Sequence, residues 1–383
     1  MTDNLGDGRM AYGGTGAMKL DEIIQILESI APPEYAAPGD SIGLQVGDPD
    51  QDVRRVVVTL DVTPQVVAEA VRQKADLLVS HHPVIRNPLP SVRLDVYPQS
   101  LIYELVNAGI GLYVMHTNLD SAPGGINDVL ADRLGVVDTK VLEPTYSGKM
   151  FKLVVFVPGE AVDAVRDAIS EVEAGVIGNY SHCSFMSPGT GTFKPLDGAE
   201  PYIGKVGELE SVPEFRLEVL VKEDRLHDAI SAMLDAHPYE EAAYEVYPLW
   251  NKGEEFGLGR YGRLRTPMTF DGFHEMVRDV LEVEETRVSG DPESRVETVA
   301  IMCGGGGSRV ELAHSKGVDV YLTGDVNHHQ FLHAKALGMN VIDATHFWTE
   351  RPGMIAFAPR LHDLLSTDGV TVEYVDDVIL GGA

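Results

Sequence analysis

The sequence predicts an α/β protein in which one α/β domain is interrupted by an inserted α+β domain. Three observations support this prediction. Strand-like and helix-like segments alternate near both ends of the chain, a strand-helix-strand order occurs twice in the middle, and potential metal ligands follow several strand-like segments. The chain has 383 residues, more than a typical single domain, so we expect two domains.

The N-terminal part alternates apolar runs with amphipathic patterns. We expect helix 19–30, strand 55–60, helix 64–74, strand 77–80, helix 99–108 and strand 111–115. Helices of about ten residues between strands predict βαβ units and a mostly parallel, buried sheet.

The C-terminal part shows the same alternation. We expect strand 298–302, a helix after the glycine loop 304–307, strand 318–323, helix 327–337, strand 340–343 and helix 352–365. Pro352 should occupy the first turn of the last helix, where its missing N–H has no helical partner to lose. We further expect both ends of the chain to contribute to one sheet.

The middle of the chain contains the repeat. Its first half is strand 151–157, helix 162–172 and strand 180–185, and its second half is strand 216–221, helix 224–236 and strand 242–247. Two such halves, joined by a Gly/Pro-rich surface loop at 189–207, suggest a split βαβ, ferredoxin-like domain. We therefore expect a disordered leader at 1–17, the α/β domain at 18–144 and 256–383, and the inserted domain at 145–255.

The composition is typical of a soluble globular protein. The chain is 44% hydrophobic and 23% charged, and no apolar run approaches the roughly 18–20 residues that span a bilayer. The only cysteines are Cys183 and Cys303, so we expect a reducing cytoplasm and no disulfide framework. A net charge of −29 argues against nucleic-acid and membrane partners.

Potential metal ligands follow three of the expected strands. His81 and His82 come directly after strand 77–80, Asp120 lies a few residues after strand 111–115, and two more ligands, His346 and Glu350, follow strand 340–343. Ligands of open α/β sheets bind at the carboxyl ends of the strands. A helix that begins near residue 345 would place His346 and Glu350 on one face, one turn apart.

The number and type of these side chains indicate a divalent-metal site. Five N and O ligands exceed the needs of one four-coordinate zinc and could hold two metals, bridged by a carboxylate or a water. Imidazole with carboxylate suits Zn, Mn, Fe or Co. Each piece has an ordinary explanation as well: a surface His-His pair, Asp120 as a turn or N-cap residue, and a solvated helix face at His346 and Glu350. Their coincidence at strand ends favours the metal site.

The chain resembles the GTP cyclohydrolase 1 type 2 homologue family, also called the Nif-three-like family. The resembling motifs, in family order, are GLQVG at 43–47, SHHP at 80–83, HTNLD at 116–120, GGIND at 124–128, TGD at 323–325 and HFWTE at 346–350. The middle domain resembles the PII/CutA trimeric fold at 178–185, 189–193 and 237–241. One departure is Gly39-Asp40-Ser41, where the family commonly has an aromatic residue followed by Asp and Asn.

The resemblance implies a site, an assembly and an activity. Its metal ligands would be His81, His82, Asp120, His346 and Glu350, with Glu350 bridging two divalent ions, and its assembly would be a homohexamer. The name of the family implies GTP as substrate, but no residue of this sequence shows how guanine would be recognised. Our first hypothesis is therefore a metal-dependent hydrolase of a nucleotide or another small molecule. The alternative is a non-catalytic metal-binding or regulatory oligomer.

Two further histidines are candidates for proton transfer or for supporting a ligand. His116 lies four residues before Asp120, and His329 follows the strand that ends at Thr323. Each has an ordinary alternative. His116 could be satisfied by backbone groups, and His329 could simply belong to a capped helix start.

Overall fold

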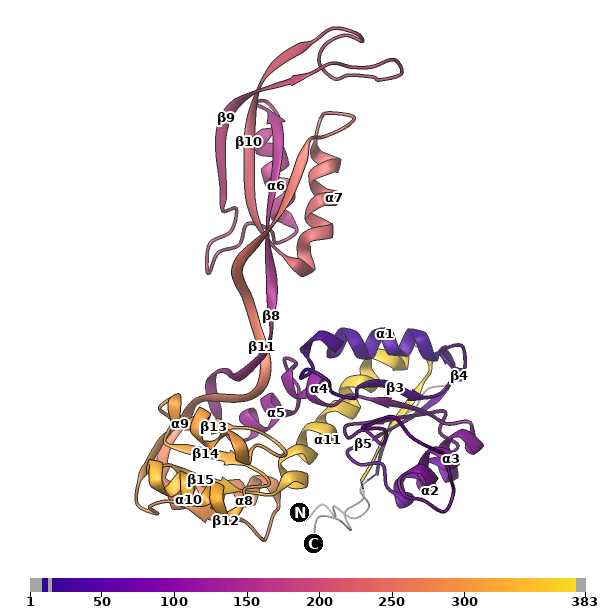
Figure 1. The fold of residues 1–383 in the computed structure, drawn as a ribbon, viewed down its shortest axis with the longest axis vertical. Coiled ribbons are helices and arrows are strands. Elements are labelled where there is room, and N and C mark those ends of the chain that lie inside the picture. The colour runs from indigo at the N-terminus through magenta and orange to yellow at the C-terminus, as the bar shows by residue number, and fades with distance from the viewer. Residues whose placement is uncertain (1–8, 13–15, 377–383) are drawn as a thin grey trace. The chain divides into compact units, whose positions relative to one another are not determined.

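The computed structural model describes residues 9–12 and 16–376. The chain divides into two compact units, the first made of residues 1–146 and 256–383 and the second of residues 147–255 (Figure 1). The second unit is therefore inserted into the first, and its N-terminal boundary lies two residues beyond the expected position. Both units are mixtures of helices and strands, so the protein is of the mixed α/β type.

One sheet of the first unit has the strand order β1-β16-β5-β6-β7-β3. These strands are β1 (Arg9–Tyr12), β16 (Thr371–Val375), β5 (Arg55–Thr59), β6 (Leu77–Ser80), β7 (Gly111–Val114) and β3 (Gly43–Val46). β16, β5, β6 and β7 are parallel, and the two edge strands are antiparallel to their neighbours. Every residue of β6 and β7 is buried, as expected of parallel strands covered on both faces.

The N-terminal leader differs from expectation where the structure describes it. Residues 9–12 form β1, which pairs with β16, whereas we expected a disordered leader over 1–17. A sequence of four residues between glycine-rich segments gives no strand signal, and β1 forms through the edge that β16 offers it. Residues 1–8 and 13–15 lie outside the described part of the chain.

The helices around this sheet form where the apolar spacing predicts them. They are α1 (Leu20–Ile30), α2 (Pro64–Gln73), α3 (Gln99–Ala108), α4 (Thr117–Ser121) and α5 (Ile126–Arg133). α1 buries four apolar residues spaced three or four apart, which is the pattern of a helix with one core-facing side. α2 begins with Pro64 after Thr63, whose hydroxyl accepts the N–H of Val66. The short strands β2 (Met18–Lys19) and β4 (Asp52–Val53) form a separate pair.

A second sheet belongs to the C-terminal part of the first unit. The strands that reach the first unit are, in spatial order, β12 (Arg287–Ser289), β15 (Asn340–Asp343), β14 (Val320–Thr323), β13 (Arg295–Ile301), β11 (Tyr244–Thr269) and β8 (Val136–Pro158), and the order then continues with two strands of the second unit. The helices of this part of the first unit are α8 (Phe270–Leu281), α9 (Val310–Ser315) and α10 (His328–Leu337). The expectation of a single sheet was wrong, although β16, from the C-terminal end of the chain, does join β5 in the first sheet. β11 pairs with the edge of β13 that faces away from β14, and β8 follows β11 in the sheet. The parallel strands β13, β14 and β15 therefore pair with one another and not with β5–β7.

The long helix α11 (His346–Leu365) connects the two sheets of the first unit, since it follows β15 and precedes β16 (Figure 1). It begins six residues earlier than expected, and Pro352 lies in its interior. A proline there removes one helical hydrogen bond. Burial of Thr349, Glu350 and Met354 around it stabilises the helix nevertheless. One buried cluster contains side chains of the first sheet, the second sheet and α11, so they share a core.

The second unit has the element order β-α-β-β-α-β. It contains the end of β8, α6 (Val162–Glu171), β9 (Ser184–Phe193), β10 (Glu210–Lys222), α7 (Leu226–Ala236) and the start of β11, and its strands are ordered β11-β8-β10-β9. A core of its own lies between the sheet and the two helices. β9 continues to Phe193, so the first part of the expected surface loop 189–207 is a strand, because it pairs with the long strand β10.

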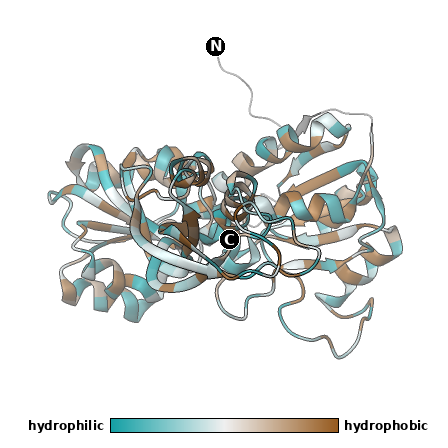
Figure 2. Ribbon diagram, turned by 90° about the horizontal axis from the view of Figure 1, so that it is seen from above, coloured by the Kyte–Doolittle hydropathy of each residue, from teal (hydrophilic) through white to brown (hydrophobic). Residues whose placement is uncertain are grey.

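The colouring by hydropathy agrees with these packing relations. Hydrophobic residues follow the strands, and the helices carry hydrophobic and hydrophilic residues side by side (Figure 2). Among the residues described, no helix has the length and apolar character needed to cross a membrane.

A buried arginine connects the two segments of the first unit. Arg260 of β11 is 5% exposed and pairs with Asp128 of α5 at 2.5 Å. Its guanidinium also donates to the carbonyl oxygens of Gly257, Gly259 and Ser121. Removing this buried guanidinium would destabilise the fold, because the Asp128 carboxylate and the carbonyl oxygens would be left without a donor.

We therefore predict that Arg260→Met lowers the free energy of unfolding by about 3 kcal/mol. Arg263→Met is the matched control on the same strand, because Arg263 pairs with Asp138 at an exposed position. We expect that control to change the free energy of unfolding by no more than about 0.5 kcal/mol. Urea denaturation of the full chain measures both, and equal effects of the two variants would contradict the role assigned to Arg260.

Candidate metal centre

The histidine pair lies at the carboxyl end of β6. The N–H groups of His81 and His82 donate to the carbonyl oxygens of Thr59 and Leu60, so both backbones continue the pairing of β6 with β5. This pairing holds the two side chains at one end of the sheet. His81 is fully buried and the His82 side chain is 12% exposed.

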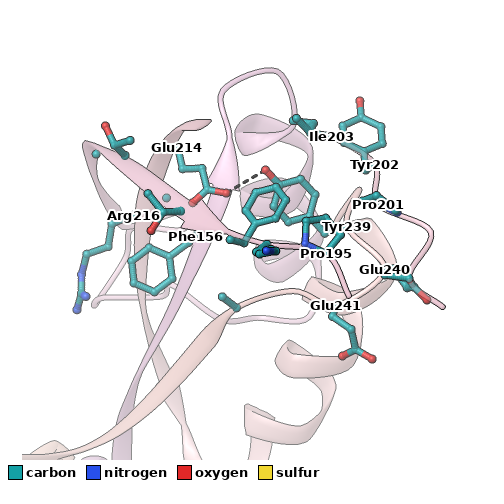
Figure 3. Close-up of a pocket in the computed structure, with 18 of the residues that line it drawn as sticks. Phe156, Pro195, Pro201, Tyr202, Ile203, Glu214, Arg216, Tyr239, Glu240 and Glu241 are labelled. Atoms are coloured by element: carbon teal, nitrogen blue, oxygen red, sulfur yellow. Dashed lines mark hydrogen bonds between the residues drawn. The ribbon is translucent and has the colours of Figure 1, made fainter. Parts of the chain in front are cut away.

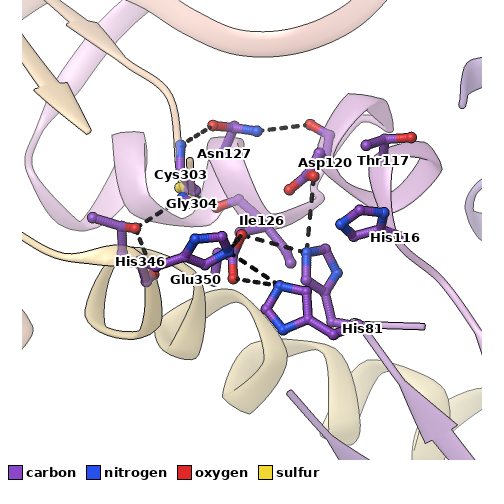
Figure 4. A network of polar contacts seen from close by, with 12 residues as sticks. His81, His116, Thr117, Asp120, Ile126, Asn127, Cys303, Gly304, His346 and Glu350 are labelled. Atoms are coloured by element: carbon purple, nitrogen blue, oxygen red, sulfur yellow. Dashed lines mark hydrogen bonds and ion pairs between the residues drawn. The ribbon is translucent and has the colours of Figure 1, made fainter. Parts of the chain in front are cut away.

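Asp120 reaches the same place from α4, the short helix that follows β7. It is 7% exposed. The side chain of Asn127 donates to the carbonyl oxygen of Asp120 and accepts the N–H of Cys303, which follows β13. Asn127 thus ties the segment that carries Asp120 to the second sheet (Figure 4).

His346 and Glu350 lie in the first turns of α11 and face the histidine pair (Figure 4). Gly304, in the glycine loop after β13, gives them room. A Cβ atom at this position would lie 2.1 Å from Oε1 of Glu350 and 3.2 Å from Nε2 of His346. The φ of Gly304 is also positive, at 69°, which disfavours any other residue.

The five predicted ligands converge, although they come from distant parts of the chain. Nε2 of His82 lies 3.2 Å from Oε2 of Glu350 and 3.2 Å from Nε2 of His346. Nε2 of His346 lies 3.2 Å from Oε1 of Glu350. Nε2 of His81 lies 3.6 Å from Oε1 of Glu350 and 3.8 Å from Oδ2 of Asp120.

The outward-facing nitrogen of each histidine is held by an oxygen acceptor. Nδ1 contacts the carbonyl oxygen of Met115 in His81, a carboxylate oxygen of Asp61 in His82 and a carboxylate oxygen of Asp325 in His346, at 2.7 to 2.8 Å. Because these oxygens only accept, Nδ1 carries the proton in each neutral ring. The lone pair then lies on Nε2, which is the tautomer that metal-binding histidines adopt beside a carboxylate or carbonyl.

Three buried polar atoms at the centre of the cluster make no hydrogen bond within the described residues: Nε2 of His81, Oδ1 of Asp120 and Oε2 of Glu350. Buried polar atoms usually have partners, and three unsatisfied atoms of one cluster indicate a missing group. These three atoms are two carboxylate oxygens and one imidazole nitrogen, and each can donate a lone pair to a divalent cation. The residues present therefore fit a metal ion.

When no metal is bound, protonated histidines balance the negative charge of the buried carboxylates. Burial alone would lower the pKa of His82, but the negative charge of Glu350 and the contacts with Asp61 and Glu350 raise it to about 10. The pKa of His346 rises to about 9 because its contacts with Glu350 and Asp325 outweigh burial. The pKa of Asp120 is raised by burial and by the Glu350 charge. The pKa of Glu350 is lowered, since the neighbouring histidines outweigh its burial.

The structure separates the two histidines that we considered for proton transfer. His116 lies beside the ligand pair, with ring centroids 5.1 Å from His81 and 5.6 Å from His82. Its Nδ1 contacts Asp40 at 2.8 Å. His329 is exposed in the first turn of α10 and is absent from the residues that line the cavity at the cluster.

Two carboxylates that support the site were not singled out as functional from the sequence. Asp40 accepts from Thr117 and contacts His116, and these contacts lower its pKa although burial opposes the shift. It belongs to the segment 39–41 that departs from the family pattern, yet it keeps the aspartate. Asp61 follows β5 by two residues, so the same rule that selected His81 and Asp120, a polar side chain after a strand end, would have found it.

A cavity of about 260 Å³ opens onto the cluster. Apolar side chains of Leu258, Met302 and Cys303 form part of its wall. Arg86 is the one arginine or lysine among the described lining residues, and it is exposed. The cavity therefore combines a strongly polar floor, an apolar wall and the positive charge of Arg86, and protonated His82 and His346 add positive charge when no metal is bound.

The fold and the site together define a class of protein: mixed α/β proteins with a cluster of histidines and carboxylates that could hold a metal ion. The sequence matches the Duf34/NIF3 (NGG1p interacting factor 3) family over residues 18–377. The chain belongs to this family, as the motifs at 43–47, 80–83 and 116–120 led us to expect.

Curated relatives and solved structures agree with this membership. A Bacillus subtilis protein named GTP cyclohydrolase 1 type 2 homolog is 45% identical over 326 residues, which cover 85% of this chain and 87% of the relative. A Mycobacterium leprae protein of the same name is 37% identical over 350 residues, 90% of each chain. The crystal structure of a Bacillus cereus protein related to NIF3 superposes with a TM-score of 0.83 at 41% identity, covering 94% of this chain and 96% of that one.

We predict that metal binding near pH 7 releases two to three protons per chain, because Asp120, whose pKa is raised to about 7, is also partly protonated in the metal-free protein. His82 and His346, with pKa values of about 10 and 9, are protonated in the metal-free protein at that pH and must become neutral to bind a cation. The apparent affinity for Zn²⁺ should accordingly increase as the pH rises from 6 to 9. Calorimetric titration in buffers of different ionisation enthalpy measures the proton count. Binding without proton release would contradict this view of the site.

Proposed function

We propose that this protein is a dinuclear, divalent-metal-dependent hydrolase of a nucleotide or another small molecule. The proposed ligands are His81, His82, Asp120, His346 and Glu350, with Glu350 bridging the two ions. The observation that carries the proposal is the common orientation of the histidines. In each of the three histidines, Nδ1 contacts an oxygen acceptor. Nε2 then faces the buried carboxylates and is available to bind a metal ion.

The number of ions is supported by two overlapping groups of side chains. His81, His82 and His116 bring one ligand atom each within 4.8 Å of one another, and so do His82, His346 and Glu350. The two groups share His82 and so offer two neighbouring positions. We propose Asp120, 3.8 Å from Nε2 of His81, as a ligand of the first position, and we assign His116 to proton transfer. Imidazole and carboxylate ligands without thiolates suit Zn, Fe, Mn or Co.

The proposed chemistry combines the metals with side chains of the cavity. Two divalent ions held by these residues would lower the pKa of a water molecule and would polarise the group that it attacks. His116 is placed to move a proton, because Asp40 holds its Nδ1 and leaves Nε2 as the available nitrogen. Leu258, Met302 and Cys303 would contact the apolar part of a bound molecule.

The cavity favours a small, anionic reacting group. Its volume of about 260 Å³ lies just below the usual range of ligand pockets, about 300–1,000 Å³, so it accommodates part of a nucleotide rather than the whole. Arg86 at its border offers a planar guanidinium, which binds phosphate or carboxylate. GTP remains a useful probe because the curated relatives carry it in their name.

We expect His346→Ala and Glu350→Ala to lower the metal content from about two ions per chain, since each removes one ligand of the group formed by His82, His346 and Glu350. His329→Ala is the control, because His329 is an exposed histidine outside the cavity lining. Elemental analysis of purified protein after metal loading gives the content. Unchanged content in the two ligand variants would refute the proposed site.

The activity is tested with GTP, other nucleotides and simple phosphoesters on protein loaded with Zn, Mn, Fe or Co. We expect turnover of an anionic substrate and its loss in Glu350→Ala. Arg86→Met should raise KM by about tenfold, since a charge-assisted contact contributes about 1.5–3 kcal/mol when it is fully formed. Absence of turnover with every metal and substrate would favour the alternative function.

That alternative is a non-catalytic metal-binding or regulatory oligomer. It is supported by the second unit, whose β-α-β-β-α-β order and strand order β11-β8-β10-β9 fit our proposal of an inserted ferredoxin-like, PII/CutA-like domain. It is also supported by exposed apolar side chains at Leu94, Tyr97 and Val106 of the first unit, which suit a subunit interface.

The proposed assembly is a homohexamer, and the free cysteines fit our proposal that it lies in the cytoplasm. Light scattering should give a mass of about six times 41.6 kDa. A monomeric mass would refute the oligomer while leaving the metal site untouched.

A further inference from the structure

The second unit contains a cavity of about 600 Å³, far larger than the one at the metal centre (Figure 3). Strands β9 and β10, the loop after β9 and the segment 239–243 line it. Its volume lies inside the usual range of small-molecule sites. Four aromatic residues contribute to the lining: Phe156, Phe193, Tyr202 and Tyr239.

A buried carboxylate lies among these rings. Glu214 of β10 is only 8% exposed, and its Oε1 accepts a hydrogen bond of 2.9 Å from the hydroxyl of Tyr239 (Figure 3). Gly191 on the neighbouring strand leaves space for it, since a Cβ there would lie 2.0 Å from Oε2 of Glu214. Apart from Tyr239, no described residue donates a hydrogen bond to this carboxylate.

No described cation neutralises Glu214. Arg216 is on the same face of β10, but its guanidinium donates to Glu218 at 2.9 Å and pairs with Glu245 at 3.6 Å. Lys194, the other basic lining residue, is exposed. Two further carboxylates, of Glu240 and Glu241, add negative charge to the lining.

The histidine nearest to Tyr239 is held in its neutral form. Nδ1 of His237 accepts the N–H of Tyr239 at 3.1 Å, so Nε2 carries the proton that it shares with the carbonyl oxygen of Phe156 at 3.0 Å. Burial also lowers the pKa of His237. Burial and the adjacent Glu214 charge raise the pKa of Tyr239. His237 thus positions Tyr239 without supplying a positive charge.

We propose that this cavity binds a small organic cation, whose charged group pairs with Glu214 and whose apolar part lies against the aromatic rings. A carboxylate that is only 8% exposed and pairs with no described cation favours a cationic ligand, which supplies the missing countercharge. The faces of Phe and Tyr rings attract ammonium and guanidinium groups as well. An anionic ligand would instead meet the buried carboxylate of Glu214. The site is separate from the metal centre, because every residue used here lies in the second unit.

The test is calorimetric titration of the full chain with agmatine, putrescine and choline as cations and with glutarate as the anion. We expect at least one cation to bind with a Kd below roughly 1 mM and glutarate not to bind. Glu214→Gln keeps the shape of the side chain and an acceptor for Tyr239 but removes the charge. It should weaken cation binding by about tenfold or more. Glu171→Gln, an exposed substitution of the same type on α6, should change it by no more than about twofold.

A second variant keeps the proposal testable if Glu214→Gln fails to fold. Phe193→Leu retains the charge and most of the apolar volume but removes a ring that lines the cavity beside Tyr239, and it should weaken cation binding by several-fold. Failure of all three cations to bind, preference for glutarate, or equal cation affinity in Glu214→Gln and the natural sequence would each overturn the proposal. Metal content and hydrolysis report only on the first unit, so those results stay independent of this one.

Discussion

The packing of α11 against both sheets is the constraint on which the first unit depends. The helix leaves β15 of one sheet and leads to β16 of the other, and its residues Met354 and Phe357 lie in the shared core. It approaches α5 closely, because a Cβ at Gly353 would lie 2.8 Å from Cα of Ile126. The contacts that hold the two sheets together therefore also fix the distance between His346 and the histidine pair of β6.

The candidate centre is organised mainly by side chains that do not face its middle. Asp61 and Asp325 fix the rings of His82 and His346, while a backbone oxygen does the same for His81. Rings oriented in this way lose little freedom when a ligand binds. The negative charge of the buried carboxylates attracts cations. Protons on the neighbouring side chains balance this charge until a divalent cation replaces them.

Most of the first unit could be predicted from local patterns, because its strands are short apolar runs and its helices have one apolar face. The convergence of His81 and Asp120 was also predictable, since they follow the ends of the neighbouring parallel strands β6 and β7. His346 follows a strand of the other sheet, so its place beside them depends on the packing of α11 and not on the strand ends alone. The separation into two sheets was not predictable, because it depends on long-range pairing of β8 and β11 rather than on any local signal. The start of α11 was misplaced because Pro352 favours a first-turn position locally, whereas burial of the surrounding residues decides the helix in the folded chain.

The insertion of residues 147–255 between the two segments of the first unit has a consequence for synthesis. His81, His82 and Asp120 leave the ribosome early, whereas His346 and Glu350 emerge only near the end of translation. The second unit has a core of its own and can reach its fold while the first is still incomplete. A chain that stops before α11 would carry three of the five proposed ligands and no β16, so nascent or truncated chains could not present the complete set of ligands to cellular metal.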